Sequence, residues 1–207
     1  MAGKIYYYHG TCDAVKTGRL LTTAFQLERS GRKNLYIKPK TNELTEPILR
    51  SDLNISKPAI IVKPGERILE ACCNHGIETM TEIHNIIVGE AHFFTKEQIK
   101  ELSIISALYN VDVYCTGLKT NYKGELFEAS AELLCCAETI EEYKCICQLC
   151  SKENKTNKAT YNLLVRNNFP IFQGAERQAP DENTIYIAVC RKHYLDAKKN
   201  EKVPIII

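Results

Sequence analysis

The sequence predicts an α/β fold, with a parallel β-sheet flanked by helices and followed by a small zinc-binding subdomain. Three observations support this prediction. Short β-rich runs alternate with helical runs from the N-terminus to about residue 142, and strands separated by helices form parallel sheets through crossover connections. Beyond that point β-rich runs dominate, and two paired Cys/His spacings appear. We therefore expect a domain over 1–142, a zinc-binding subdomain over 143–194 and a tail over 195–207.

Each element of the first part has its own local signal. Residues 4–8 (KIYYY) are rich in β-formers. Residues 16–31 place apolar side chains near one helical face and end at a glycine, as helices commonly do. Thr95 and Gln98 form a capping box that opens a helix over 96–110. The other predicted strands are 34–39, 58–65, 84–94, 111–118 and 140–146, and the other predicted helices are 66–76 and 124–138.

The second part is predicted from shorter signals. Residues 159–165 and 184–189 are β-rich, and between them lies a loop that carries Gly174 and Pro180. The tail has a charged helix end followed by the apolar run VPIII.

Composition narrows the function classes. The 207 residues are 44% hydrophobic and 25% charged, which is ordinary for a globular protein. A net charge of +2 creates no strong field toward nucleic acids or membrane surfaces. The sequence contains neither an apolar run of bilayer-spanning length nor a signal-peptide core at the N-terminus. We expect a cytoplasmic protein with no nucleic-acid or membrane partner.

Two short motifs predict a metal site. Cys147 and Cys150 form a C-x-x-C turn, and Cys190 and His193 form a C-x-x-H turn. Two such turns supply four ligands for a tetrahedral Zn²⁺, and a site closed by four protein ligands is structural. Cys145 is a spare thiol that competes with Cys147 for the metal in this interpretation.

A third motif suggests phosphate binding. Residues 10–17 (GTCDAVKT) differ from the P-loop pattern G-x-x-x-x-G-K-[ST] only at Val15. That pattern cradles phosphates with backbone N–H groups and a lysine, and its hydroxyl binds Mg²⁺.

Several longer blocks carry a family resemblance together with these motifs. The runs IIVGEAHFFTKEQIKEL, VYCTGLKTNYKGELFEAS, QGAE and YIAVCRKHY occur in order between about residues 4 and 194. Together with the P-loop position and the C-x-x-C turn, they resemble the type II thymidine kinases, a zinc-containing P-loop family. The resemblance implies ATP and Mg²⁺ as cofactors, a zinc-stapled lasso loop over the nucleoside base, and a homotetramer.

The resemblance also implies roles for individual residues. Glu90 matches the general base that acts on the nucleoside 5′-hydroxyl. Gly10, Lys16 and Thr17 match the phosphate and Mg²⁺ positions. The matches to the nucleoside pocket, each of which plain core packing explains equally well, are Phe93, Leu118, Phe127 and Tyr186.

The departures from the family pattern lie at positions that the resemblance assigns to phosphate, metal and base recognition. Val15 replaces a glycine whose conformation a β-branched residue resists, so the loop is expected to relax away from its phosphate-binding shape. Asp13 adds a negative charge, and Gly89 stands where a Mg²⁺-organising carboxylate is expected. Other departures are His92, the Asn42–Glu43–Leu44 block, Leu164, Gln173 and a longer loop between Glu176 and Tyr186.

Two functions remain open at this stage. The favoured one is a thymidine kinase-like protein that is catalytically impaired and acts as a binding or structural subunit of a homo-oligomer or hetero-oligomer. The alternative is an active, divergent deoxynucleoside kinase that needs Mg²⁺ and ATP. The departures at the Mg-ATP site favour the first, and the matches at Lys16, Thr17 and Glu90 favour the second.

Overall fold

A computed structural model describes residues 2–42, 45–176 and 183–205. Glu43 and Leu44 of the divergent block, positions 177–182 of the lengthened loop with Pro180, and the last two residues of the tail lie outside these ranges. The chain divides into two compact units. Unit 1 comprises residues 1–9, 15–117 and 128–141, and unit 2 comprises residues 10–14, 118–127 and 142–207.

Unit 1 is built on a six-stranded sheet with the order β5-β2-β6-β7-β1-β8. The pairs β1–β7, β7–β6, β6–β2 and β2–β5 are all parallel. The strands are β1 (Ile5–Gly10), β2 (Asn34–Pro39), β5 (Ile60–Val62), β6 (Asn85–Val88), β7 (Asp112–Gly117) and β8 (Thr139–Tyr143). The predicted α/β class with a parallel sheet is confirmed.

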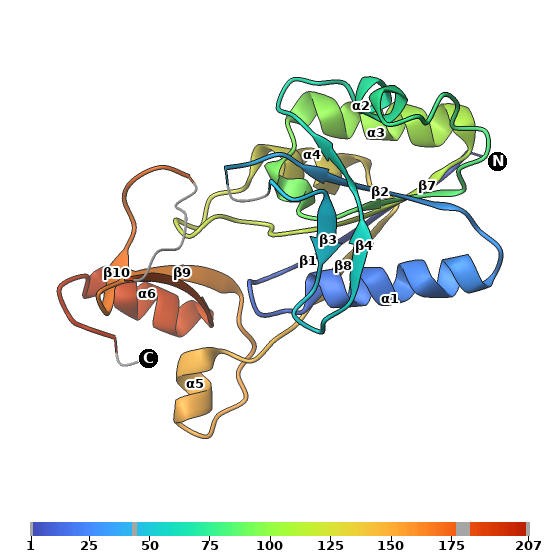
Figure 1. Cartoon of the computed structure of the whole chain (residues 1–207). Helices are drawn as coiled ribbons and strands as arrows, with labels where there is room; N and C mark the ends of the chain where they lie inside the picture. Colours follow the sequence, from blue (N-terminus) through green and yellow to red (C-terminus); the bar gives the residue numbers. More distant parts are fainter. Residues whose placement is uncertain (1, 43–44, 177–182, 206–207) are drawn as a thin grey trace. The chain divides into compact units, whose positions relative to one another are not determined.

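Helices cover both faces of this sheet (Figure 1). On β6, Ile86 and Val88 pack into the core shared with α2 (Ile68–Asn74), α3 (Lys96–Tyr109) and α4 (Glu128–Cys136), whereas Ile87 packs with α1 (Lys16–Arg29) on the opposite face. Successive side chains of a strand point to opposite faces, so a strand covered on both sides is apolar throughout. This explains the continuous apolar runs in the sequence. The predicted capping box of Thr95 and Gln98 is present at the start of α3.

A short hairpin, which the sequence did not predict, lies beside α1 in unit 1. It consists of β3 (Ile48–Arg50) and β4 (Ser56–Pro58), paired antiparallel. A Cβ at Gly18 would lie 2.9 Å from Leu53 Cδ1 and 3.0 Å from Ser51 Oγ, so the hairpin loop approaches α1 closely at a residue without a side chain. The hairpin therefore lies next to the first turn of α1.

The predicted strand over 84–94 is too long. β6 ends at Val88, and a short 3₁₀ helix, η1 (Ala91–Phe93), follows. Glu90 has left-handed backbone angles, with φ 52° and ψ 36°, and therefore breaks the extended conformation. The apolar side chains beyond Val88 are still buried or half-buried, but the backbone there no longer forms a strand.

Unit 2 contains a three-stranded antiparallel sheet of order β10-β9-β11. Its strands are β9 (Tyr161–Arg166), β10 (Phe169–Ile171) and β11 (Thr184–Val189), and its helices are α5 (Gln148–Lys152) and α6 (Arg191–Lys199). Ile205 of the tail packs against the core of this unit, and its backbone N–H donates to the Asn168 carbonyl oxygen at 2.7 Å. Among the described residues, no helix is both long enough and apolar enough to cross a lipid bilayer.

Candidate functional site

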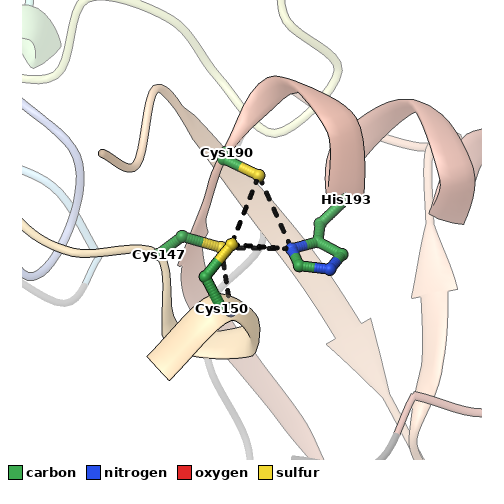
Figure 2. A group of neighbouring side chains, drawn as sticks. All are labelled: Cys147, Cys150, Cys190 and His193. Atoms are coloured by element: carbon green, nitrogen blue, oxygen red, sulfur yellow. Dashed lines mark hydrogen bonds between the residues drawn. The ribbon is translucent and has the colours of Figure 1, made fainter. Parts of the chain in front are cut away.

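The two Cys/His turns converge in unit 2 (Figure 2). Cys147 and Cys190 directly precede α5 and α6, and His193 lies in the first turn of α6. The four ligand atoms of Cys147, Cys150, Cys190 and His193 all lie within 4.8 Å of one another. All three cysteines are buried.

The distances in this cluster suit a tetrahedral zinc ion. Zn–S bonds of about 2.3 Å at tetrahedral angles hold two sulfurs about 3.8 Å apart, and a sulfur and a nitrogen about 3.5 Å apart. The Cys150 and Cys190 sulfurs are 3.8 Å apart, and His193 Nδ1 lies 3.3 Å from the Cys147 sulfur and 3.5 Å from each of the other two. The donor set and its spacing therefore fit a structural zinc.

The surroundings of the cluster support metal binding. Burial raises the pKa of the Cys147 thiol, but hydrogen bonds from the backbone of Cys150 and Cys190 and from His193 outweigh burial and lower the pKa to about 7. A thiol with such a pKa readily supplies the thiolate that binds metal. The Asn157 side chain donates to the Cys150 sulfur at 3.3 Å, and a Glu153 oxygen lies 3.9 Å from His193 Nε2. Such outer contacts orient metal ligands.

A second constellation lies in unit 1, where β2, β3 and β6 end near α1. Thr17 and Glu90, two of the residues assigned by resemblance, line one pocket of about 260 Å³. The sequence interpretation missed its other polar lining residues. These are Lys38, Thr45, Glu46 and Arg50.

Lys38 is the missed residue with a recognisable signal, because it is a cation near the carboxyl end of a parallel strand. It is 5% exposed, and its ammonium donates to the Ile48 carbonyl oxygen at 2.9 Å. Burial lowers the pKa of Lys38, while the nearby Glu90 and Glu46 carboxylates oppose that shift. The pocket thus already holds an ammonium group beside its two carboxylates.

Val15 adopts a backbone conformation that glycine adopts freely and β-branched residues resist. Its φ of 52° and ψ of 35° lie in the left-handed region, and it forms the N-cap of α1. The expectation that this residue would relax out of that conformation is wrong. The side chain is 42% exposed, so Val15 adopts the strained conformation without steric hindrance from a packed core. Lys16 is buried in the first turn of α1, and Thr17 is half-buried.

A side chain at Gly89 would meet the end of the Leu49 side chain. A Cβ at this position would lie 2.1 Å from Leu49 Cδ1 and 3.3 Å from two other Leu49 atoms. Leu49 is 3% exposed and belongs to the core between the sheet and α1. An apolar side chain therefore occupies the space into which a residue-89 side chain would project, and Leu49 would have to move to admit one.

The residues matched to the nucleoside pocket are divided between the units. In unit 1, half-buried Phe93 lies against the His92 ring with centroids 3.8 Å apart. In unit 2, Leu118 and buried Phe127 flank a loop closed by backbone contacts, including Phe127 N–H to the Lys119 carbonyl oxygen. Tyr186 of β11 meets the Tyr122 ring edge-on at 6.4 Å.

Tyr122 is a further residue that the sequence interpretation missed. Its ring is fully buried, and its hydroxyl lies 3.1 Å from the Gln173 carbonyl oxygen and 2.8 Å from that of Ala175. The Tyr194 hydroxyl donates to the Tyr122 carbonyl oxygen at 2.9 Å. These contacts connect the 118–127 loop to residues 173–175, within unit 2.

The fold and the two constellations define a class of protein: an α/β protein with a phosphate-loop position at the start of α1 and a Cys₃His cluster in a second unit. A family model described as thymidine kinase matches residues 3–194. The chain belongs to the thymidine kinase family.

Individual relatives agree with this assignment. A protein named thymidine kinase from Francisella tularensis is 35% identical over 197 residues, which cover 92% of this chain and 96% of the relative. Thymidine kinases from Mannheimia succiniciproducens and from Streptococcus pyogenes are each 31% identical, over 92% and 93% of this chain and 94% and 97% of the relative.

Proposed function

We propose that this protein is a thymidine kinase-like protein impaired in phosphoryl transfer from Mg-ATP, and that it acts as a binding or structural subunit. The observation that carries the proposal is the Leu49 side chain in the space that a carboxylate at position 89 would need. Phosphoryl transfer depends on positioning and on neutralising charge with a metal ion. A protein that lacks one metal-organising carboxylate therefore loses part of that stabilisation, about 10²–10³ in rate for one such contact.

The proposal includes a metal and an assembly. We propose one structural Zn²⁺ held by Cys147, Cys150, Cys190 and His193, since their distances suit tetrahedral coordination. We also propose an oligomer, with copies of itself or with another subunit, in the cytoplasm. Light scattering together with co-purification tests the assembly, and a clean monomer with no co-purifying subunit would contradict it.

An active, divergent deoxynucleoside kinase is the second candidate. Thr17 and Glu90 line the same pocket, and Val15 has left-handed backbone angles of the kind that glycine adopts freely. Lys38 and Arg50 add positive charge to that pocket. This candidate requires that these groups bind a nucleotide without the carboxylate at position 89.

A phosphate-transfer assay distinguishes the two candidates. Purified protein is given radiolabelled ATP, Mg²⁺ and thymidine, with the Francisella tularensis relative as the positive control. We expect turnover to be absent or lower than in the relative by orders of magnitude, because one lost electrostatic contact costs about 10²–10³ in rate. Turnover in the usual kinase range of about 1–100 per second would refute the proposal.

Thermal-shift measurements separate binding from chemistry. A ligand that binds only the folded protein raises its melting temperature. ATP alone, ATP with Mg²⁺, and thymidine are tested separately. We expect Mg²⁺ to add nothing to any shift produced by ATP, and a Mg²⁺-dependent shift would count against the loss of the metal site.

A further inference from the structure

Residues 10–14 of the phosphate-loop sequence group with unit 2, although Gly10 is also the last residue of β1. A Cβ at Gly10 would lie 2.5 Å from the Tyr143 carbonyl oxygen, so the backbones approach closely there. The Thr11 hydroxyl lies 3.0 Å from the Cys145 sulfur. The first contact joins the ends of the neighbouring strands β1 and β8, and the second places Thr11 against Cys145, two residues before the C-x-x-C turn.

Two further hydrogen bonds hold the same segment. The Cys12 backbone N–H donates to Asn162 Oδ1 at 2.9 Å. The Gln148 side-chain amide donates to Asp13 Oδ2 at 2.6 Å. Asp13, which the sequence interpretation treated only as a repulsive charge beside phosphates, is thus an anchor point. A hydrogen bond to a carboxylate is stronger than one between neutral groups.

Two of these anchors, Gln148 and Asn162, lie in elements close to the ligands of the Cys₃His cluster. Gln148 lies between Cys147 and Cys150, inside the C-x-x-C turn itself. Asn162 on β9 pairs in register with Ala188 on β11, two residues before Cys190. A metal ion bound by both turns therefore fixes the elements that carry Gln148 and Asn162.

We propose that Gln148 is a positioning residue for the phosphate-loop segment, and that metal in the Cys₃His cluster orders residues 10–14 through it. The metal fixes the C-x-x-C turn, the turn directs the Gln148 amide, and the amide holds Asp13. A helix of five residues such as α5 is not stable on its own, so the metal would add its constraint to the backbone hydrogen bonds that hold this turn, such as that from Cys147 N–H to the Asn157 carbonyl oxygen. The inference is independent of whether Mg-ATP is used, since it concerns the order of the segment alone.

Amide hydrogen exchange of the full-length, zinc-loaded protein tests this proposal. The readout is a peptide covering residues 10–14, whose Cys12 and Ala14 amides donate to Asn162 and to the Thr11 carbonyl oxygen. Gln148→Ala is expected to keep its zinc and to raise exchange in this peptide by about fivefold or more. Ser151→Ala, an exposed change in the same short helix, is the matched control and should leave exchange unchanged.

A double-mutant cycle separates the specific contact from general loosening. Asp13→Ala should have the same effect as Gln148→Ala, and the double variant should add nothing, because both remove one hydrogen bond. Asp13→Asn retains an accepting oxygen and should keep most of the protection. Wild-type exchange in Gln148→Ala, or fully additive effects in the double variant, would overturn the proposal.

Stepwise chelation tests the link to the metal. Exchange in residues 10–14 should rise in proportion to zinc loss while β6, which lies in unit 1, stays protected. Unchanged protection of residues 10–14 after zinc has left would refute the coupling. Equal loss of protection in β6 would also refute it, because the effect would then be general unfolding.

Discussion

Gly89 offers the most direct test of how this chain has changed at its metal-organising position. We predict that Gly89→Ala lowers the free energy of unfolding by about 1–3 kcal/mol, the usual cost of inserting a methyl group into a packed core. The new Cβ would lie 2.1 Å from Leu49 Cδ1, whereas carbon atoms normally approach to about 3.5–4.0 Å. The Leu49 side chain must therefore turn or shift by roughly 1.5 Å, and it is almost fully buried.

Shortening Leu49 should relieve this cost. Leu49→Ala alone is expected to cost about 2–5 kcal/mol through lost burial and a cavity. In the double variant Leu49→Ala with Gly89→Ala, the new methyl group fits the vacated space. The double variant should therefore lose less free energy of unfolding than the two single variants together, by at least about 1 kcal/mol. Gly89→Asp, which restores a carboxylate, should be tolerated only together with Leu49→Ala.

Urea unfolding followed by circular dichroism measures these free energies, with zinc held constant and with two-state behaviour checked by a second probe. Gly76→Ala is the control. Its φ of 81° strains any side chain, but a Cβ there meets nothing within 4 Å, so Leu49→Ala should not relieve it. Stability of Gly89→Ala within about 0.5 kcal/mol of wild type would refute the reasoning, since overpacking normally costs more than that. Strict additivity with Leu49→Ala would refute it as well.

Two further predictions concern the phosphate loop and the metal. Val15→Gly should raise the free energy of unfolding by about 0.5–1 kcal/mol, because the strain of a left-handed β-branched residue exceeds the entropy that glycine loses on folding. Asn110→Gly, at φ 55°, is the control with a smaller gain, and a Val15→Gly variant less stable than wild type would contradict this account. Elemental analysis should find about one zinc per chain, and chelation should lower the melting temperature. A metal-free preparation that melts at the same temperature would contradict the zinc assignment.

The sequence predicted the sheet of unit 1 well because its strands are covered on both faces. Such strands are rich in apolar residues, and Asn34–Pro39 of this sheet was predicted with its observed bounds, as was Thr184–Val189 of the unit 2 sheet. The β3–β4 hairpin was missed because its strands have three residues each, with charged residues and a proline among them. Runs this short show no periodicity that distinguishes a strand from a loop.

The site was predictable only where a spacing encodes geometry. The C-x-x-C and C-x-x-H turns each place two ligands on one short turn, and the four ligand atoms do converge. The bond between Asp13 and Gln148 joins residues 135 positions apart, and no local pattern indicates it. Leu49 and Gly89 are likewise brought together only by the packing of β3 against the end of β6, which depends on a hairpin that the sequence did not reveal.

Val15 and Gly89 look alike as departures in the sequence, but the structure gives them different meanings. Val15 has left-handed backbone angles, which glycine adopts freely and a β-branched residue adopts at the cost of local strain. At Gly89 the Leu49 side chain occupies the space of a Cβ, so a carboxylate there requires Leu49 to move. The proposed impairment of catalysis therefore concerns the metal side of the site and not the loop. For the same reason, the thermal-shift comparison of ATP with and without Mg²⁺ tests the proposed impairment most directly.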